Sequence, residues 1–143
     1  CKIIDLSQSK EKLWNNLRHS YKSIINKGLS TNTFEVFDSK SISNKHLDLH
    51  LKLHRRREGG RSIESYESMH NMVINKEGIF HIQYYEGNAL QTLYTILGKN
   101  MGYGGSTARN HNINAPIPPT HSLNWKMLLD LKKLGLQLAA HQS

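Results

Sequence analysis

The chain has 143 residues, of which 37% are hydrophobic and 21% are charged, and its formal net charge is +8 with nine histidines counted as neutral. This composition excludes a disordered segment, and no apolar run approaches the length of a membrane span. The single cysteine, Cys1, excludes an internal disulfide and a multi-cysteine zinc site, and it fits a reducing compartment. Because the chain begins with Cys, we expect residues 1–143 to be one module of a longer cytoplasmic protein.

The first half of the sequence predicts three helices and one short strand. Apolar side chains recur at spacings of three and four over residues 7–27, which predicts one amphipathic helix ended by Gly28. The segment FEVF (34–37) is a candidate strand. A second helix is expected over 43–58, and Ser62 is expected to cap a third helix that Gly78 ends.

The second half changes to the period of β-structure. The segments IFHIQYYE (79–86) and ALQTLYTIL (89–97), joined by Gly87-Asn88, predict a β-hairpin. We expect GYGGST (102–107) and residues 108–119 to form loops, followed by a helix over 121–134 that Thr120 caps and Gly135 ends. The segment LQLAAHQS (136–143) predicts a closing strand parallel to the strand before the loop. The predicted class is mixed α/β.

The segment GYGGST is the first candidate for a ligand site. It lacks the Gly-Lys-Ser/Thr ending of a P-loop and the spacing of a dinucleotide-binding fingerprint. Its glycines would let a ligand approach the backbone closely, and free N–H groups and two hydroxyls would face that ligand. The alternative interpretation is a strand end that bulges and turns.

Basic and histidine side chains give three further candidates. Arg55, Arg56, Arg57 and Arg61 have the fork geometry that suits phosphate, although solvated charges at a helix end would look the same. The histidines at 46, 50 and 54 share one helical face, but no cysteine or acidic ligand is evident beside them, so we expect no metal site. His121 and Trp125 stand one turn apart at a helix start, where they would either face the loop or belong to the core.

The order of these segments resembles the acetyltransferase-like module of FemAB-type aminoacyltransferases, which build peptidoglycan bridges, and of related GNAT-superfamily proteins. The resemblance lies in LHLKLHRRREGGRSIESYESMHNMV, the hairpin, the YGGST segment and PTHSLNWKMLLDLKKLGLQ. It implies the GNAT-like fold, a mixed β-sheet flanked by helices. The sequence departs from the family in its closing strand, which has no acidic residue, and in having room for one module where FemAB enzymes have two.

The resemblance implies transfer of an acyl or aminoacyl group from a thioester or charged tRNA to an amine, with no bound cofactor. Acyl-CoA or aminoacyl-tRNA would be the co-substrate. The acceptor would be an amine such as that of a lipid-linked cell-wall precursor, and the reaction would take place in the cytoplasm or at the inner membrane face. Tyr103, Ser106 and His121 are the expected catalytic residues. Substrate binding is expected at Arg57, Arg61, Gly104, Gly105 and Trp125.

Two other interpretations of the sequence remain open. The positive charge alone is typical of a non-catalytic module that binds nucleic acid or anionic lipid headgroups, with an affinity that falls steeply with salt. A structural remnant whose cleft is closed by side chains is the third interpretation.

Overall fold

The computed structural model describes residues 2–54 and 62–141. Their elements are, in chain order, β1 (Lys2–Asp5), α1 (Lys10–Asn15), α2 (His19–Thr31), β2 (Thr33–Phe37), α3 (Asn44–His54), α4 (Ile63–Ile74), β3 (Gly78–Tyr85), β4 (Asn88–Leu97), β5 (Met101–Arg109), α5 (Thr120–Lys133) and β6 (Leu138–His141). Within these ranges no helix has the length and apolar character needed to cross a bilayer.

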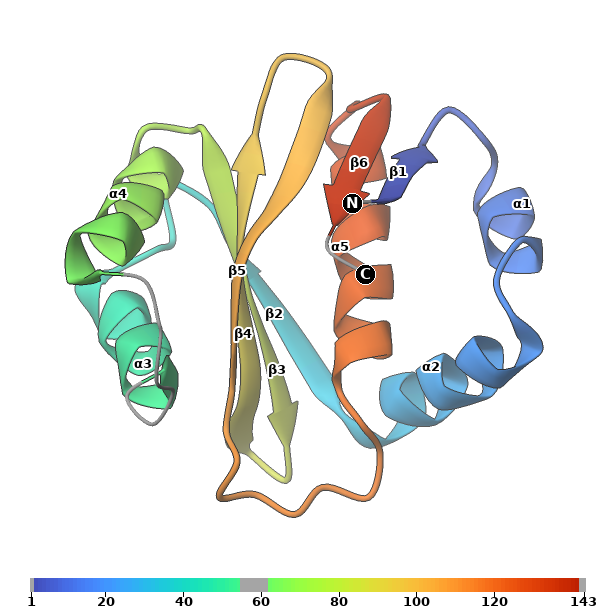
Figure 1. The fold of residues 1–143 in the computed structure, drawn as a ribbon, viewed down its shortest axis with the longest axis horizontal. Helices are drawn as coiled ribbons and strands as arrows, with labels where there is room; N and C mark the ends of the chain where they lie inside the picture. The colour runs from blue at the N-terminus through green and yellow to red at the C-terminus, as the bar shows by residue number, and fades with distance from the viewer. Residues whose placement is uncertain (1, 55–61, 142–143) are drawn as a thin grey trace.

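Six strands form one sheet in the order β1-β6-β5-β4-β3-β2. Neighbouring strands are antiparallel, except that β5 and β6 run parallel. Helices α3 and α4 cover one face of the sheet, and α5, α2 and α1 lie on the other side (Figure 1). The predicted mixed sheet flanked by helices is therefore confirmed. The closing strand is present, but it runs parallel to β5, which was predicted as a loop, and not to β4, the strand predicted before that loop.

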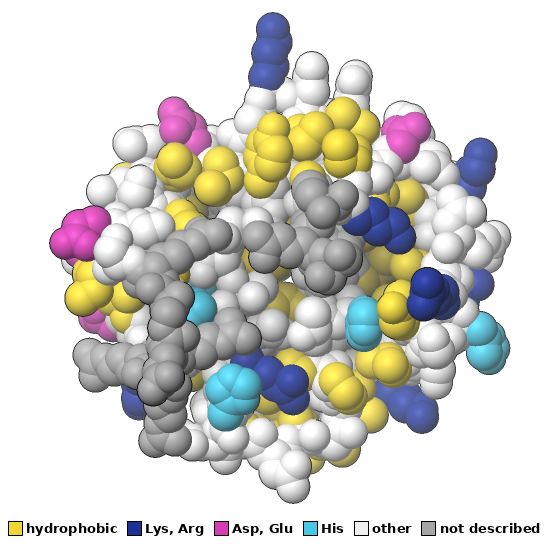
Figure 2. Space-filling view, viewed as in Figure 1, with side chains coloured by type: hydrophobic (Ala, Val, Ile, Leu, Met, Phe, Trp, Pro, Cys, Tyr) yellow, Lys and Arg dark blue, Asp and Glu magenta, His cyan; other side chains and the backbone are white. Residues whose placement is uncertain are grey.

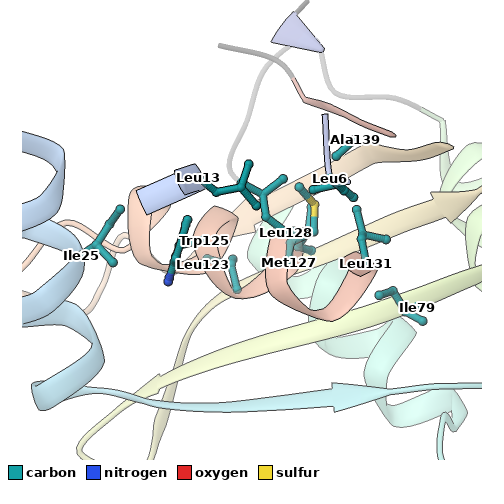
Figure 3. Packing of buried hydrophobic residues seen from close by; sticks show 11 residues of the cluster. Leu6, Leu13, Ile25, Ile79, Leu123, Trp125, Met127, Leu128, Leu131 and Ala139 are labelled. Carbon is teal, nitrogen blue, oxygen red and sulfur yellow. The ribbon is translucent and has the colours of Figure 1, made fainter. Parts of the chain in front are cut away.

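Both faces of the central strands are buried, which explains their nearly continuous apolar sequence. In β3, Ile79 faces α5 and belongs to one core cluster, whereas the next residue, Phe80, faces α4 and belongs to the other. The cluster on the α5 side is the larger of the two, and Met127 and Leu131 of α5 are fully buried at its centre (Figure 3).

The predicted helix over 7–27 is wrong as a single element. The chain forms α1 and α2 instead, because Arg18 takes an extended conformation between them (φ −61°, ψ 145°). Leu17 continues the apolar stripe across the break between the two helices, so the hydrophobic periodicity does not reveal the break. Gly28, predicted as the helix end, lies inside α2. Its absent Cβ lets α2 approach Ser122 of α5, since a Cβ there would lie 2.7 Å from the Ser122 hydroxyl oxygen.

The middle of the chain follows the prediction with small shifts. The strand FEVF and the Ser62-capped helix are confirmed, but that helix ends at Ile74 and Gly78 is the first residue of β3. The hairpin is confirmed as well. Its turn lies at Glu86-Gly87, where both residues have positive φ, rather than at Gly87-Asn88. The end of the helix predicted over 43–58 lies outside the described residues.

The glycine cluster is not a loop. Residues 101–109 form β5, and Gly102 is required there because a Cβ would lie 2.7 Å from both terminal methyl carbons of Leu131. The last helix is confirmed, but Thr120 does not cap it: the cap position is Pro119, which makes no side-chain hydrogen bond. Gly135 ends the helix in the left-handed conformation (φ 84°), as predicted.

Candidate active site

Strand β5 carries a bulge at its centre. Ser106 lies opposite Tyr94 and Gly104 lies opposite Thr95, so Gly105 is an extra residue with no partner on β4. A Cβ at Gly105 would lie 3.1 Å from the carbonyl oxygen of Tyr94 and 3.3 Å from the sulfur of Met69. Only glycine fits this position without displacing a neighbour. The bulge also brings the Ser106 side chain to the face of the sheet that α3 and α4 cover.

The parallel pair β5–β6 is short. Its register covers Met101, Gly102 and Tyr103 alone, whereas β5 runs on to Arg109. Among the described residues, the part of β5 from Gly104 onward therefore has a strand partner only in β4. The pairing covers β6 up to Ala140, one residue before the strand ends at His141, and Gly104 and Gly105 follow directly after the last paired residue of β5.

A cluster of polar side chains surrounds the Ser106 hydroxyl. His50 Nε2 lies 3.0 Å and His54 Nε2 lies 3.2 Å from Ser106 Oγ, and His50 Nδ1 lies 2.7 Å from Thr92 Oγ1. Both histidines come from α3, one turn apart. Burial, with a smaller effect from the charge of His54, lowers the pKa of His50 from 6.5 to about 3. His50 is therefore a neutral imidazole at physiological pH.

A second group of residues lies on the opposite side of the sheet. The ring of His121 stacks on that of Tyr21, with centroids 4.2 Å apart and an interplanar angle of 25°, and the guanidinium of Arg18 lies 5.8 Å from the Tyr21 centroid. These three side chains line a cavity of about 360 Å³ between β1, α2 and α5. Its walls include aliphatic side chains, and Lys2 and Arg18 are its cationic residues.

A buried hydrogen-bond network holds the start of α5 beside this cavity. Gln83 of β3 donates to the carbonyl of Pro119 (2.9 Å), and its own side-chain oxygen accepts from Asn32 (2.7 Å) and Ser122 (3.0 Å). The network links α2, β3 and α5, and it holds Pro119 in place at the start of α5.

Three comparisons place this geometry among known proteins. No family model matches the chain, and no curated protein matches it in sequence. Its fold is similar to that of FemX (TM-score 0.72, 11% identity, 96% of this chain and 51% of that one). It is also similar to the C-terminal domain of a protein from Agrobacterium fabrum that is described provisionally as a lysylphosphatidylglycerol synthetase. The TM-score is 0.65 at 14% identity, over 96% of this chain and 44% of that one.

A third similar structure is a protein described as a predicted acetyltransferase from Clostridium acetobutylicum, solved with acetyl-CoA (TM-score 0.50, 11% identity, 78% of this chain and 80% of that one). The chain has a GNAT-like fold. The resemblance to FemAB-type and GNAT proteins is thereby confirmed as a likeness of fold. The chain spans about half the length of FemX and of the synthetase domain, at 51% and 44%.

The GNAT-like fold separates the expected site residues into two groups. Tyr103, Gly104, Gly105 and Ser106 follow one another on β5, and Tyr103 is 45% exposed. His121 and Trp125 line the cavity on the other side of the sheet, and Trp125 is buried and packs its ring edge against Trp14 (5.1 Å). The structure does not bring His121 to Ser106. The expected positions Arg57 and Arg61 lie outside the described residues.

The sequence interpretation missed the roles of His50, His54 and Thr92. The spacing of the two histidines was visible, but the sequence interpretation weighed it only as a possible metal site, which it did not expect. The described residues contain no group of three His, Cys, Asp or Glu side chains that could hold a metal. Their shared contact with Ser106 joins positions more than fifty residues apart, for which the sequence gives no signal.

Proposed function

We propose that this chain is an N-acyltransferase module, which transfers an acyl or aminoacyl group from a thioester or charged tRNA to an amine. The observation that carries this proposal is the Gly105 bulge of β5, which places two glycines beside the Ser106 hydroxyl in a strand that, among the described residues, pairs with β6 only up to Tyr103. An extended donor can pair with backbone N–H and C=O groups of β5 beyond Tyr103, as an added strand would.

The backbone at the bulge suits the reaction. A donor carbonyl can approach Gly104 and Gly105 closely because neither has a side chain. Backbone N–H groups there would stabilise the negative charge that develops on the carbonyl oxygen when the amine attacks. The hydroxyl of Tyr103 is an additional donor to this oxygen. Holding donor and amine together in this geometry supplies the rest of the rate gain.

The cavity on the other side of the sheet suits the remote part of the donor. Lys2 and Arg18 supply positive charge beside the aromatic rings of Tyr21 and His121. Figure 2 shows that Lys and Arg side chains lie mainly on the half of the visible face formed by α1, α2 and α5. Phosphates of coenzyme A or of tRNA would bind there, and we assign Arg57 and Arg61 to the same task of binding anionic groups. Trp125 forms the cavity floor.

For the acceptor, we propose an amine of a lipid-linked cell-wall precursor, reached in the cytoplasm or at the inner membrane face. The names of two similar structures, FemX and lysylphosphatidylglycerol synthetase, support a donor of the aminoacyl type. The acetyltransferase solved with acetyl-CoA supports the alternative donor, acyl-CoA.

Thermal melting of the purified chain tests this function. Coenzyme A, acetyl-CoA, a mixture of charged tRNAs and heparin are each added at low and moderate salt. We expect a saturable rise in melting temperature with one donor that persists at moderate salt. A site of defined shape binds its ligand through contacts other than charge attraction, and salt does not screen those contacts. Equal shifts with tRNA and heparin that vanish with salt would instead support the non-catalytic polyanion-binding module.

A further inference from the structure

The contacts of Ser106 impose a direction on the hydrogen bonds around it. A serine hydroxyl has one proton, yet Ser106 Oγ lies within hydrogen-bond distance of Nε2 of both His50 (3.0 Å) and His54 (3.2 Å). It can therefore donate to only one of the two rings, and the other ring must donate to it.

Burial selects His54 as the acceptor. His50 is fully buried and its pKa is lowered to about 3, so it is a poor base that keeps the neutral form. With Nε2–H donating to Ser106, its Nδ1 accepts the proton of the Thr92 hydroxyl at 2.7 Å. The resulting chain of donors runs from Thr92 through His50 and Ser106 to His54.

We propose that Ser106 and His54 form a proton relay that removes the proton from the acceptor amine, with His50 and Thr92 as positioning residues that fix its direction. This inference rests on the proposed acyl transfer and gives its site a base different from His121. Ser106 would be the residue that contacts the amine, since it is half-buried beside the bulge, and His54 would hold the proton.

The reaction step balances without any further reactant. The amine nitrogen forms a bond to the donor carbonyl carbon, and its proton passes to Ser106 Oγ while the Ser106 proton passes to His54 Nε2. The C–S bond of a thioester, or the C–O bond of an aminoacyl ester, then breaks. The leaving thiolate or alkoxide takes the proton from His54, and both side chains return to their starting state.

Other histidines of the same face show what a purely structural imidazole looks like. Nδ1 of His46 accepts the backbone N–H of Ser43 and the ring packs on Phe37, while His70 lies against the Tyr94 hydroxyl. Each is buried in the core and is held by a partner other than Ser106. His54, by contrast, is half-buried at the end of α3 with its ring stacked on Tyr66 (centroids 4.9 Å apart), so its orientation is fixed near the surface.

Acceptors of different basicity test the relay. With the donor that the melting experiment selects, acetyl-CoA or the charged tRNA mixture, turnover is measured with Nα-acetyl-lysine amide and with hydroxylamine. The nitrogen of hydroxylamine is much less basic than that of lysine, so after attack it gives up its proton to water more easily and depends less on a protein base. For Ser106→Ala and His54→Gln we expect kcat/KM with the lysine amine to fall about 100-fold, as for loss of a general base. Turnover with hydroxylamine should change little.

The matched control is His46→Gln, which removes a buried imidazole one turn before His50 on the same helix. It should lower the melting temperature yet keep the ratio of the two acceptor activities. Equal losses with both acceptors in Ser106→Ala and His54→Gln would overturn the relay, because a change of shape affects both nucleophiles alike. Absence of turnover by the unchanged protein would refute the acyltransferase function instead.

Nitrogen NMR of ¹⁵N-histidine-labelled protein tests the direction without any donor. We expect His50 to stay neutral on acidification to about pH 4 and to carry its proton on Nε2. In Ser106→Ala the resonances of both His50 and His54 should shift, and those of His46 should not. A proton on Nδ1 of His50 would reverse the direction and overturn the proposal.

Discussion

The close contact between α2 and α5 allows a quantitative test through Gly28. An alanine Cβ at this position would lie 2.7 Å from Ser122 Oγ and 2.8 Å from Ser122 Cβ. Neither atom can move aside easily, because the hydroxyl is held by Gln83 and by the carbonyl of Pro119 at 3.0 and 3.1 Å, and the Cβ belongs to a packed helix. Helix α2 must therefore shift away from α5.

Two opposing effects set the magnitude. Replacing glycine by alanine inside a helix stabilises it by roughly 1 kcal/mol, whereas overpacking a filled contact costs roughly 1–3 kcal/mol. We expect Gly28→Ala to lower the free energy of unfolding by about 1 kcal/mol. Ser23→Ala, on the exposed side of the same helix, measures propensity alone and should stabilise by about 0.5 kcal/mol.

Urea unfolding of a double-mutant cycle with Ser122→Gly is the assay. Ser122→Gly removes both atoms that Gly28→Ala would strike, so the double variant should be more stable than the sum of the single effects by about 1 kcal/mol or more. Additive effects, or a Gly28→Ala variant as stabilised as Ser23→Ala, would refute the claim that this glycine is kept for close packing.

Three further predictions concern the core, a buried ion pair and the cavity. Leu131→Ala, at a fully buried position, should cost about 2–5 kcal/mol of unfolding free energy, whereas Leu134→Ala, at a position 55% exposed, should change it by less than about 0.5 kcal/mol in the same urea assay. Burial of Asp130 opposes its ionisation, but the hydrogen bond from His81 at 2.7 Å and the charges of His81 and nearby lysines lower its pKa overall from 3.8. The ionised Asp130 therefore stabilises the fold at pH values above its unfolded pKa, and this stabilisation is lost as the pH falls through the lower folded pKa. In acid titrations, the free energy of unfolding should therefore fall less below about pH 4 in Asp130→Asn than in the unchanged chain. Arg18→Gln at the cavity should weaken the binding of coenzyme A or tRNA in direct titrations, with the larger effect at low salt. The control is Lys27→Gln, which removes an exposed cation of the same helix outside the cavity lining and should leave binding unchanged. Equal effects of the two variants would mean that only total charge determines binding.

Local signals explain which elements the sequence predicts well. The hairpin was predictable because Gly87 supplies one of the two positive φ angles that a tight turn needs. The end of α5 was predictable because Gly135 takes the left-handed conformation there. Both signals lie within a few residues of the feature they specify.

The errors concern features that depend on contacts distant in sequence. The glycines of β5 look like a loop, and only Leu131, Met69 and Tyr94 explain why a strand needs them. The Lys2–Asp5 strand was not predicted because its four residues form a strand only by pairing with β6, at the other end of the chain. The expected catalytic set joined Ser106 and His121 because both flank the same segment, although the sheet lies between them.

One inserted residue explains how the candidate site forms. Side chains alternate between the two faces of a strand, so without the bulge Ser106 would share the face of Gly102, which packs on Leu131 of α5. The extra residue, Gly105, reverses this alternation and brings Ser106 opposite Tyr94, on the face where His50 and His54 lie. The same residue lies two positions after Tyr103, the last residue of β5 that pairs with β6. The donor-binding backbone and the proton relay therefore depend on a single structural feature, the bulge, and each would be lost with it.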